Sequence, residues 1–273
     1  MNPRAWVAAA IVASAVLAYA GYRVILHASH IQPAIVTPKM DAQQAISSSF
    51  AGHVKRLLNE RVTYANREGR PKLIALTFDD GPYPIFTPLL IDELRKLDVP
   101  ATFFLIGRDA QQWPELAQRI ERSGNEIADH TYTHPNLDQE SPPQVRREIL
   151  EGRDVLYGMV HDPALLDEFR PPHGRYTLQT IQVAQSLGYK TILWTDDGGD
   201  WRTVTARSLA DHLEQHATAP EIVLLHSGKL ATIEMLPEVV ARFRAAGYRF
   251  VTVGQMLRQV PAADLNHPAK RAV

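Results

Sequence analysis

The 273-residue sequence contains no cysteine. This absence excludes disulfides, a catalytic thiol and thiolate-bound metals. Any metal must therefore be held by histidine and carboxylate groups, and eleven histidines are available. A strong charge of either sign is also absent, because 29 basic and 30 acidic residues leave a formal net charge of −1. The charge balance therefore predicts no nucleic-acid partner.

One N-terminal stretch differs in kind from the rest of the chain. Residues 5–22 carry no charge and lie between Arg4 and Arg23. Such a run is just long enough to span a bilayer, and it also fits a signal peptide cleaved near Ala20. A buried core helix is disfavoured by the position at the extreme N-terminus. Both remaining interpretations export the following chain, and we expect an uncleaved membrane anchor with an extracytoplasmic domain.

The chain divides into four parts by composition and periodicity. Residues 1–26 form the anchor or signal peptide, and residues 27–71 form a linker and a lead-in helix. Residues 72–255 alternate between strand-like and helix-like patterns. Residues 256–273 are expected to form a tail, with polar character from about Pro261.

The alternating part predicts an α/β fold. Strands are expected at 73–78, 101–106, 126–130, 169–170, 190–195, 222–226 and 249–253. Helices are expected from the Thr87-Pro88 cap pair, over 109–123, from Ser141-Pro142 to Met159, and over 177–187, 205–217 and 232–246. Such alternation implies parallel strands joined by right-handed crossovers. A barrel of about seven strands fits best. An open doubly wound sheet is the alternative, which the lack of a Gly-rich phosphate loop after the first strand disfavours.

Polar residues gather at the ends of five of these strands. In a barrel they would converge on one rim, where such folds carry their function. The five segments are Asp79-Asp80, His130 to His134, Arg170 to Gly174, Asp196 to Trp201 and Leu224 to His226. Each segment alone has an ordinary interpretation as a turn, a surface charge or a core residue. The coincidence at five strand ends favours a functional site.

Two histidines four residues apart and one carboxylate can form a metal site with open coordination positions. If Asp80 joins His130 and His134 in such a site, the adjacent Asp79 remains free beside the metal. A free carboxylate there could accept a proton from metal-bound water. The paired aspartates would then divide the work between holding the metal and acting as a base.

The motifs T-F-D-D-G, H-T-x-x-H, R-P-P-x-G, D-x-x-D-W and L-x-H occur in this order over about residues 72–255. Together they resemble the polysaccharide deacetylase family (the NodB homology domain, carbohydrate esterase family 4). The resemblance implies a distorted (β/α) barrel that removes N- or O-acetyl groups from sugars. It also implies one divalent metal ion, zinc first, with cobalt or nickel as alternatives.

Carried over motif by motif, the resemblance assigns a role to each candidate residue. The metal ligands are Asp80, His130 and His134. The catalytic residues are the base Asp79 and the acid His226. Arg170 orients Asp79, and Asp200 adjusts the pKa of His226. The substrate-binding set is His173, Trp201 and Leu224.

Three positions depart from the family pattern. His173 stands in place of an aromatic residue that is most often tyrosine, and Asn125 in place of a frequent histidine. Asp129 stands where asparagine or serine is usual, so it could add charge near the metal.

The expected function is deacetylation of an N-acetylated (or O-acetylated) glycan of the cell envelope or the extracellular space. An alternative keeps the chemistry but takes a lipid-linked sugar, which would be deformylated or deacetylated. A third alternative is a catalytically silent glycan-binding module, which would have no need to keep Asp79, His226 and all three ligands together. The expected partners are the acetylated glycan and, for an uncleaved anchor, the membrane.

Overall fold

The computed structural model describes residues 71–161 and 166–260. Residues 5–22, the predicted linker and lead-in helix, and the tail from residue 261 lie outside this range. Within it, no helix is both long enough and apolar enough to cross a bilayer.

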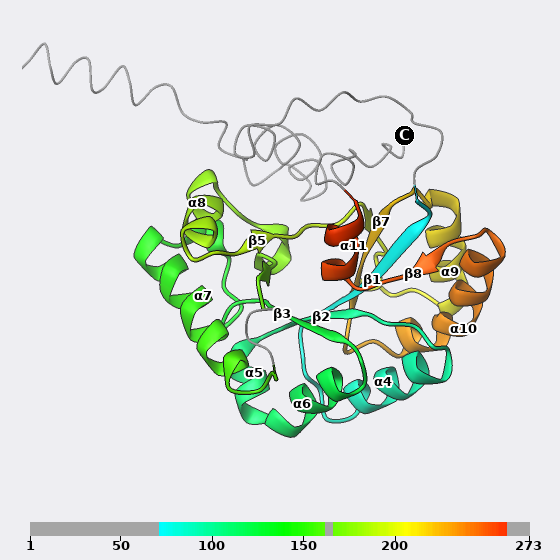
Figure 1. Cartoon of the computed structure of the whole chain (residues 1–273), viewed down its shortest axis with the longest axis horizontal. Coiled ribbons are helices and arrows are strands. Elements are labelled where there is room, and N and C mark those ends of the chain that lie inside the picture. The colour runs from blue at the N-terminus through cyan, green and yellow to red at the C-terminus, as the bar shows by residue number, and fades with distance from the viewer. Residues whose placement is uncertain (1–70, 162–165, 261–273) are drawn as a thin grey trace, which may run out of the picture. The chain divides into compact units, whose positions relative to one another are not determined.

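Eight parallel strands form the centre of the fold, and helices surround them (Figure 1). The sheet order is β5-β4-β3-β2-β1-β7-β6, and β8 pairs with the start of β1. The strands are β1 (Leu73–Asp79), β2 (Thr102–Leu105), β3 (Glu126–Asp129), β4 (Glu168–Phe169), β5 (Lys190–Thr191), β6 (Asp196–Asp197), β7 (Glu221–His226) and β8 (Arg249–Phe250). The predicted α/β barrel is thus confirmed, in a distorted form whose pairing path ends at β5 and β6.

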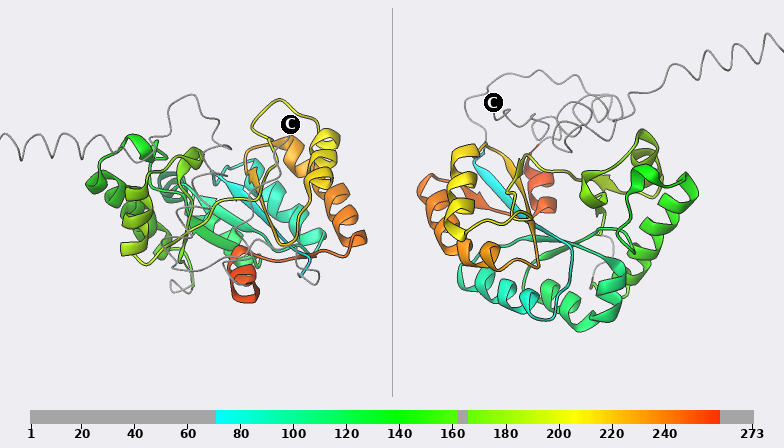
Figure 2. Two further views of the ribbon diagram at one scale, coloured as in Figure 1. Left: turned by 90° about the horizontal axis from the view of Figure 1, so that it is seen from above. Right: turned by 180° about the vertical axis from the view of Figure 1, so that it is seen from behind.

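The helices form an outer ring around the strands, seen from two further sides in Figure 2. The outer helices are α4 (Phe86–Lys96), α5 (Gly107–Gln112), α6 (Pro114–Arg122), α7 (Pro142–Tyr157), α8 (Leu178–Ser186), α9 (Ala206–His216) and α10 (Leu230–Ala245), whereas α11 (Val253–Gln259) lies inside this ring and packs on the inner cluster. Two short 3₁₀ turns, Leu137–Gln139 and Pro172–Gly174, complete the described elements.

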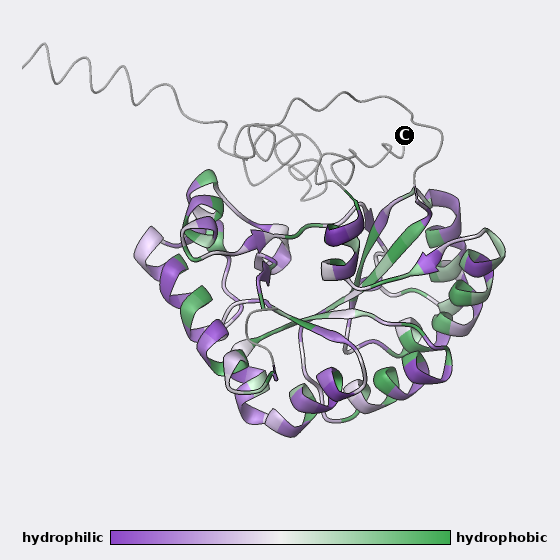
Figure 3. Cartoon of the chain, in the orientation of Figure 1, coloured by the Kyte–Doolittle hydropathy of each residue, from purple (hydrophilic) through white to green (hydrophobic). Residues whose placement is uncertain are grey.

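Strand β1 shows how the core positions the polar rim. All seven of its residues are buried, and their side chains alternate between two faces. Ile74, Leu76 and Phe78 pack in the cluster under the outer helices. Leu73 and Ala75 pack in the inner cluster with Met256 of α11. The same alternation turns Thr77 and Asp79 inward, so the inner column changes from apolar to polar toward the end of the strand. In Figure 3 β1 is coloured as apolar, whereas the outer helices mix apolar and hydrophilic turns.

Four expected elements differ from the observed ones. The predicted helix 109–123 is two helices, because Trp113 precedes Pro114 and leaves the helical conformation (φ −130°, ψ 61°). Of the predicted strand 190–195 only the first two residues form a strand, β5, which pairs with β4, and β6 follows after the end of that range and pairs with β7.

The third difference is at the start of α4. The expected cap pair Thr87-Pro88 is wrong, since the helix begins at Phe86. The Thr87 amide donates to the Tyr83 carbonyl at 3.0 Å, which starts the helical turn earlier. The fourth difference is at the other end of the domain, where the predicted strand 249–253 is only β8 and the predicted tail 256–273 begins too early, because α11 carries the chain past residue 255. Its Thr252 cap accepts from the Gln255 amide, and Met256 is fully buried.

Candidate active site

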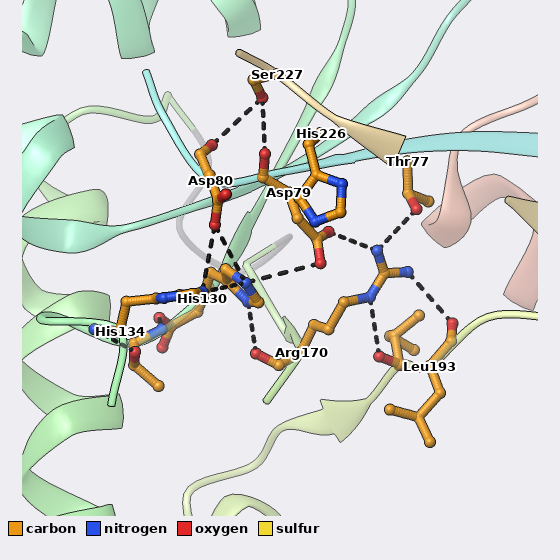
Figure 4. Close-up of polar contacts among 12 residues, drawn as sticks. Thr77, Asp79, Asp80, His130, His134, Arg170, Leu193, His226 and Ser227 are labelled. Atoms are coloured by element: carbon orange, nitrogen blue, oxygen red, sulfur yellow. Dashed lines mark hydrogen bonds and ion pairs between the residues drawn. The ribbon is translucent and has the colours of Figure 1, made fainter. Parts of the chain in front are cut away.

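Asp79 and Asp80 face the same space at the end of β1. On a continuing strand, neighbouring side chains would point to opposite faces. Asp80 instead has a left-handed backbone (φ 67°), which ends the pleat directly after Asp79. Asp79 Oδ2 lies 3.7 Å and Asp80 Oδ1 3.9 Å from the same atom, His130 Nε2. The Ser227 hydroxyl donates to the carbonyls of both aspartates, at 3.1 and 3.3 Å (Figure 4).

Asp80, His130 and His134 bring three ligand atoms together. The two Nε2 atoms are 3.2 Å apart, and Asp80 Oδ1 is 3.2 Å from that of His134 and 3.9 Å from that of His130. Tetrahedral zinc with bonds of about 2.0–2.1 Å would separate its ligand atoms by about 3.3 Å. Two imidazole nitrogens and one carboxylate oxygen also suit zinc chemically. The three residues therefore fit a divalent metal ion.

His130 is held in the form that a metal ligand needs. Its Nδ1 lies 2.8 Å from the Arg170 carbonyl, which can only accept, so Nδ1 carries the proton. Burial, with the neighbouring His134, lowers the pKa of His130 to about 3. The ring is therefore neutral, with the Nε2 lone pair directed at the other two ligand atoms.

Arg170 connects Asp79 to the barrel interior. Its side chain is fully buried, and Nη1 donates to Asp79 Oδ1 at 2.6 Å and to Thr77 Oγ1 at 2.8 Å. The other guanidinium nitrogens donate to the Ile192 and Leu193 carbonyls, both at 3.2 Å, and the group stacks over the Phe104 ring. Burial raises the pKa of Asp79, and the charge of Arg170 opposes that rise. Because Arg170 occupies Oδ1, only Oδ2 faces the metal ligands.

His226 ends β7 directly opposite Asp79 in the parallel register. Its Nδ1–H donates to Asp200 Oδ1 at 2.7 Å, and its backbone amide donates to Asp200 Oδ2 at 2.8 Å. The Thr232 hydroxyl donates to that same oxygen at 2.6 Å. Burial lowers the pKa of His226, but the hydrogen bond and charge of Asp200, with Asp79, outweigh it and raise the pKa to about 9. The ring is therefore cationic at neutral pH, with Nε2 left for the site.

Of the three predicted substrate residues, His173 contacts a metal ligand, Leu224 lies on the strand of His226, and Trp201 follows Asp200 and contacts Asp197 and Arg202. His173 is exposed on a left-handed backbone (φ 56°), with its ring centroid 4.5 Å from that of His134. Trp201 is 56% exposed, beneath the Arg202 guanidinium. Leu224 is buried on β7, two residues before His226 and thus on the same inward face.

Two of the departures from the family pattern have structural explanations. Burial raises the pKa of Asp129 to about 8, which favours the neutral form of this carboxyl beside the metal ligands. Its Oδ1 accepts the Thr131 amide at 2.8 Å. Asn125 accepts the Ala101 amide at 3.1 Å, away from the predicted site.

Several residues at the site were missed by the sequence analysis. Thr77 lies two positions before Asp79 on one strand face, so the period of two could have indicated it. Ser227 follows the predicted His226 directly. Glu148, in the middle of α7, had no local signal, yet its carboxylate accepts the Thr133 amide and hydroxyl, both at 2.8 Å.

Comparisons with known proteins agree with this geometry. Residues 66–192 match the family model described as polysaccharide deacetylase. The chain is 37% identical over 192 residues to a peptidoglycan-N-acetylglucosamine deacetylase of Bacillus cereus, covering 68% of this chain and 89% of the relative. It is 32% identical over 209 residues to a chitooligosaccharide deacetylase of Sinorhizobium fredii, covering 77% and 93%. A crystal structure of a peptidoglycan N-acetylglucosamine deacetylase superposes with a TM-score of 0.66 at 30% identity, covering 68% of this chain and 88% of that one.

Proposed function

Because the chain belongs to the polysaccharide deacetylase family, we propose that it hydrolyses the acetamido group of N-acetylated sugars in a cell-envelope glycan. One observation carries the proposal. Asp79 and His226 lie opposite each other on the adjacent strands β1 and β7, beside the three converging metal ligands. Asp79 is a carboxylate whose Oδ1 is bound by Arg170 and whose Oδ2 is free, and His226 is a cationic imidazole. This arrangement provides a base and an acid for one amide bond.

Asp80, His130 and His134 would hold a divalent metal ion, with zinc expected first and cobalt or nickel as alternatives. When bound, such an ion supplies a water of lowered pKa and polarises the acetyl carbonyl. Asp79 Oδ2 accepts the proton of the water that adds to this carbonyl. Arg170 holds Asp79 through Oδ1, and its charge favours the ionised carboxylate against the effect of burial on the pKa.

His226 completes the hydrolysis from the other side. Its Nε2–H donates a proton to the sugar nitrogen as the carbon–nitrogen bond breaks, so that acetate and a free amine leave. Asp200 holds the ring through Nδ1 and stabilises its charge. His173, Trp201 and Leu224 are proposed to contact the sugar and its acetyl group around these residues.

The names of the relatives support an N-acetylglucosamine unit as the substrate class, in peptidoglycan or in a chitin-like oligomer. The purified full chain, loaded with zinc, should release acetate from one of these glycans, measured with a coupled acetate assay. Asp79→Asn is the matched control, because it keeps the volume of the side chain. A chain that binds the glycans but releases no acetate would favour the silent module. Release only from lipid-linked sugars would favour the other alternative.

We further propose that residues 5–22 export the domain, either as an anchor or as a signal peptide cleaved near Ala20. The support is the uncharged run between Arg4 and Arg23. A reporter fused after residue 40 should be active only outside the cytoplasm, and activity confined to the cytoplasm would contradict export. A mature chain that begins at Gly21 would refute only the anchor.

A further inference from the structure

We propose that Glu148 is a positioning residue for the metal-binding loop, residues 130–134. The inference rests on the proposed metal site at Asp80, His130 and His134. It assigns a role in metal affinity to a residue of α7 that touches neither the metal ligands nor the proposed substrate contacts.

The loop has an unusual backbone that its surroundings must hold. Thr131 and His134 both lie in the left-handed region, with φ of 67° and 66°. Side chains other than glycine rarely adopt this conformation, and it persists only where contacts enforce it. The two residues flank the turn that aims the imidazole of His134 back at that of His130, so the position of the second ligand depends on those contacts.

Glu148 makes three of these contacts from one helical position. Its Oε2 accepts the Thr133 amide and its Oε1 accepts the Thr133 hydroxyl, both at 2.8 Å. Its backbone carbonyl also accepts the Tyr132 amide at 3.0 Å. The residue therefore fixes the two consecutive positions between Thr131 and His134. The His134 amide in turn donates to Thr131 Oγ1 at 3.1 Å, which closes the loop on itself.

A second helix, α5, holds the metal-binding loop from its other side and packs against α7, the helix that carries Glu148. Helix α5 donates its Gly107 and Arg108 amides to the Thr131 and Tyr132 carbonyls, at 2.9 and 3.0 Å. Helices α5 and α7 lie side by side in the outer ring (Figure 1). A Cβ on Gly107 would lie only 2.8 Å from the Cα of Gly152 on α7. This close approach leaves the carboxylate of Glu148 little freedom to move away from Thr133.

The environment of Glu148 also distinguishes it from an ordinary helix acid. It is 8% exposed, and within residues 71–161 and 166–260 it forms no ion pair with lysine, arginine or histidine. A buried carboxylate without a cation is costly unless hydrogen bonds satisfy it. Here those hydrogen bonds all come from the metal-binding loop, so the loop and the carboxylate stabilise each other.

The test compares zinc affinity in Glu148→Gln and Glu151→Gln, two identical changes on α7. Glu151 is exposed and lies 4.0 Å from Arg147, so its change is the matched control. In Glu148→Gln the amide oxygen can accept the Thr133 amide, but the amino group cannot accept from the Thr133 hydroxyl, so that contact must reverse its direction and both contacts lose the charge that strengthens them. We expect its zinc affinity, measured by competition with a chromophoric chelator, to fall about tenfold, the lower end for residues that support metal ligands. The control should match the wild type.

A second measurement separates positioning from general stability. Thermal unfolding is followed with zinc and with a chelator for each variant. Positioning predicts that the zinc-induced rise in melting temperature shrinks in Glu148→Gln. A purely structural role would lower both melting temperatures together and leave zinc affinity unchanged, which would overturn the proposal.

Thr133 provides variants that leave α7 intact. Thr133→Val removes the hydroxyl that donates to Glu148 Oε1, and Thr133→Ser keeps it. Zinc affinity should fall in the valine variant and be retained in the serine variant. This pair carries the test if Glu148→Gln does not fold, and equal affinities in the pair would overturn the proposal.

The proposed function and the Glu148 inference fail in distinguishable ways. If the wild type binds no zinc, or if His134→Ala binds it as tightly as the wild type, the metal site is wrong and the inference falls with it. If the wild type binds one equivalent and Glu148→Gln binds it equally tightly, only the positioning role is wrong.

Discussion

The two ends of strand β7 carry ionisable residues whose pKa is raised to about the same value, yet one of them is neutral and the other is charged. Glu221 begins the strand and His226 ends it. Burial, with the nearby Asp196, raises the pKa of Glu221 to about 9. Asp200 and Asp79 overcome burial and raise the pKa of His226 to the same value. At neutral pH the carboxyl of Glu221 is therefore neutral, whereas the imidazole of His226 is charged.

The difference lies in the partners that each end provides. Glu221 Oε1 and Glu168 Oε2, both at strand starts, have no hydrogen-bond partner in the part of the chain that the structure describes. At the opposite end, Asp79 pairs with Arg170, and Asp200 accepts three hydrogen bonds. Glu221 has one hydrogen bond to its other oxygen, from the Thr218 amide at 3.3 Å, and burial with so little compensation gives a neutral group that only affects stability. Burial with matched partners gives fixed charges, which acid–base chemistry requires.

The largest expected loss of activity comes from replacing either of the two aspartates at the end of β1, Asp79 and Asp80. Asp79→Asn should lower kcat about 10²–10⁴-fold, the usual loss for a general base, while zinc stays bound. Asp80→Asn should instead weaken zinc binding, and added zinc should partly restore its activity. Zinc content by elemental analysis and acetate release measured on both variants test the division. Loss of zinc in Asp79→Asn with retention in Asp80→Asn would reverse the two roles.

The charge on the His226 imidazole should be visible in the dependence of activity on pH. Because the pKa of His226 is raised to about 9, activity should persist at neutral pH and fall as the pH rises through about 9. Asp200→Asn removes the stabilising carboxylate, so this alkaline limb should move to lower pH. His226→Ala should retain zinc and lose about 10²-fold or more on amide substrates. Activated esters need less protonation and should lose less, and an equal loss on both would argue against the acid role.

A smaller effect is expected from Thr77, which the sequence analysis missed. Thr77→Val keeps the shape of the side chain but removes the acceptor for Arg170 Nη1, which still contacts Asp79. We expect kcat to fall about tenfold with KM and zinc content unchanged, as for the loss of one charge-assisted hydrogen bond. Thr77→Ser should restore the rate. A changed KM with constant kcat would show that Thr77 acts on substrate binding instead.

The smallest effect belongs to the neutral end and concerns stability. The folded pKa of Glu221 lies above its unfolded value of 4.5, so the folded state keeps a proton that the unfolded chain loses. Its contribution to stability is therefore full below about pH 4.5 and is lost as the pH rises toward 9. Glu221→Gln should remove this loss and raise the free energy of unfolding at pH 8 by about 1–3 kcal/mol. Urea unfolding at pH 5, 7 and 9 checks it, and no change in the pH dependence would contradict it.

Much of the fold followed from local signals in the sequence. β1, β7 and α7 lie close to their predicted ranges, because their apolar periods are strong and Ser141-Pro142 marks the start of α7. The break between α5 and α6 is also a local effect of Pro114, so the sequence could have predicted it.

Other features depended on contacts between distant segments. The range predicted as one strand, 190–195, is a strand only at its start, because β5 pairs with β4 and the chain then crosses to β6, beyond the predicted range, which pairs with β7. Helix α11 owes its place to Met256, which is buried in the inner cluster. The pattern of apolar residues within β5, β6 and α11 does not indicate which strand or cluster each of them packs against.

The sequence by itself determined which chemical groups stand at the strand ends and in what order. Parallel strands alternate their side chains and end on one rim, so Asp79, His130 and His226 had to meet. Only the tertiary structure decided how they meet. The left-handed turn at Asp80 that faces both aspartates inward is held by Ser227, and the carboxylate of Glu148 reaches Thr133 from a separate helix. These are hydrogen bonds between residues far apart in the chain, and their geometry exists only once the barrel has packed.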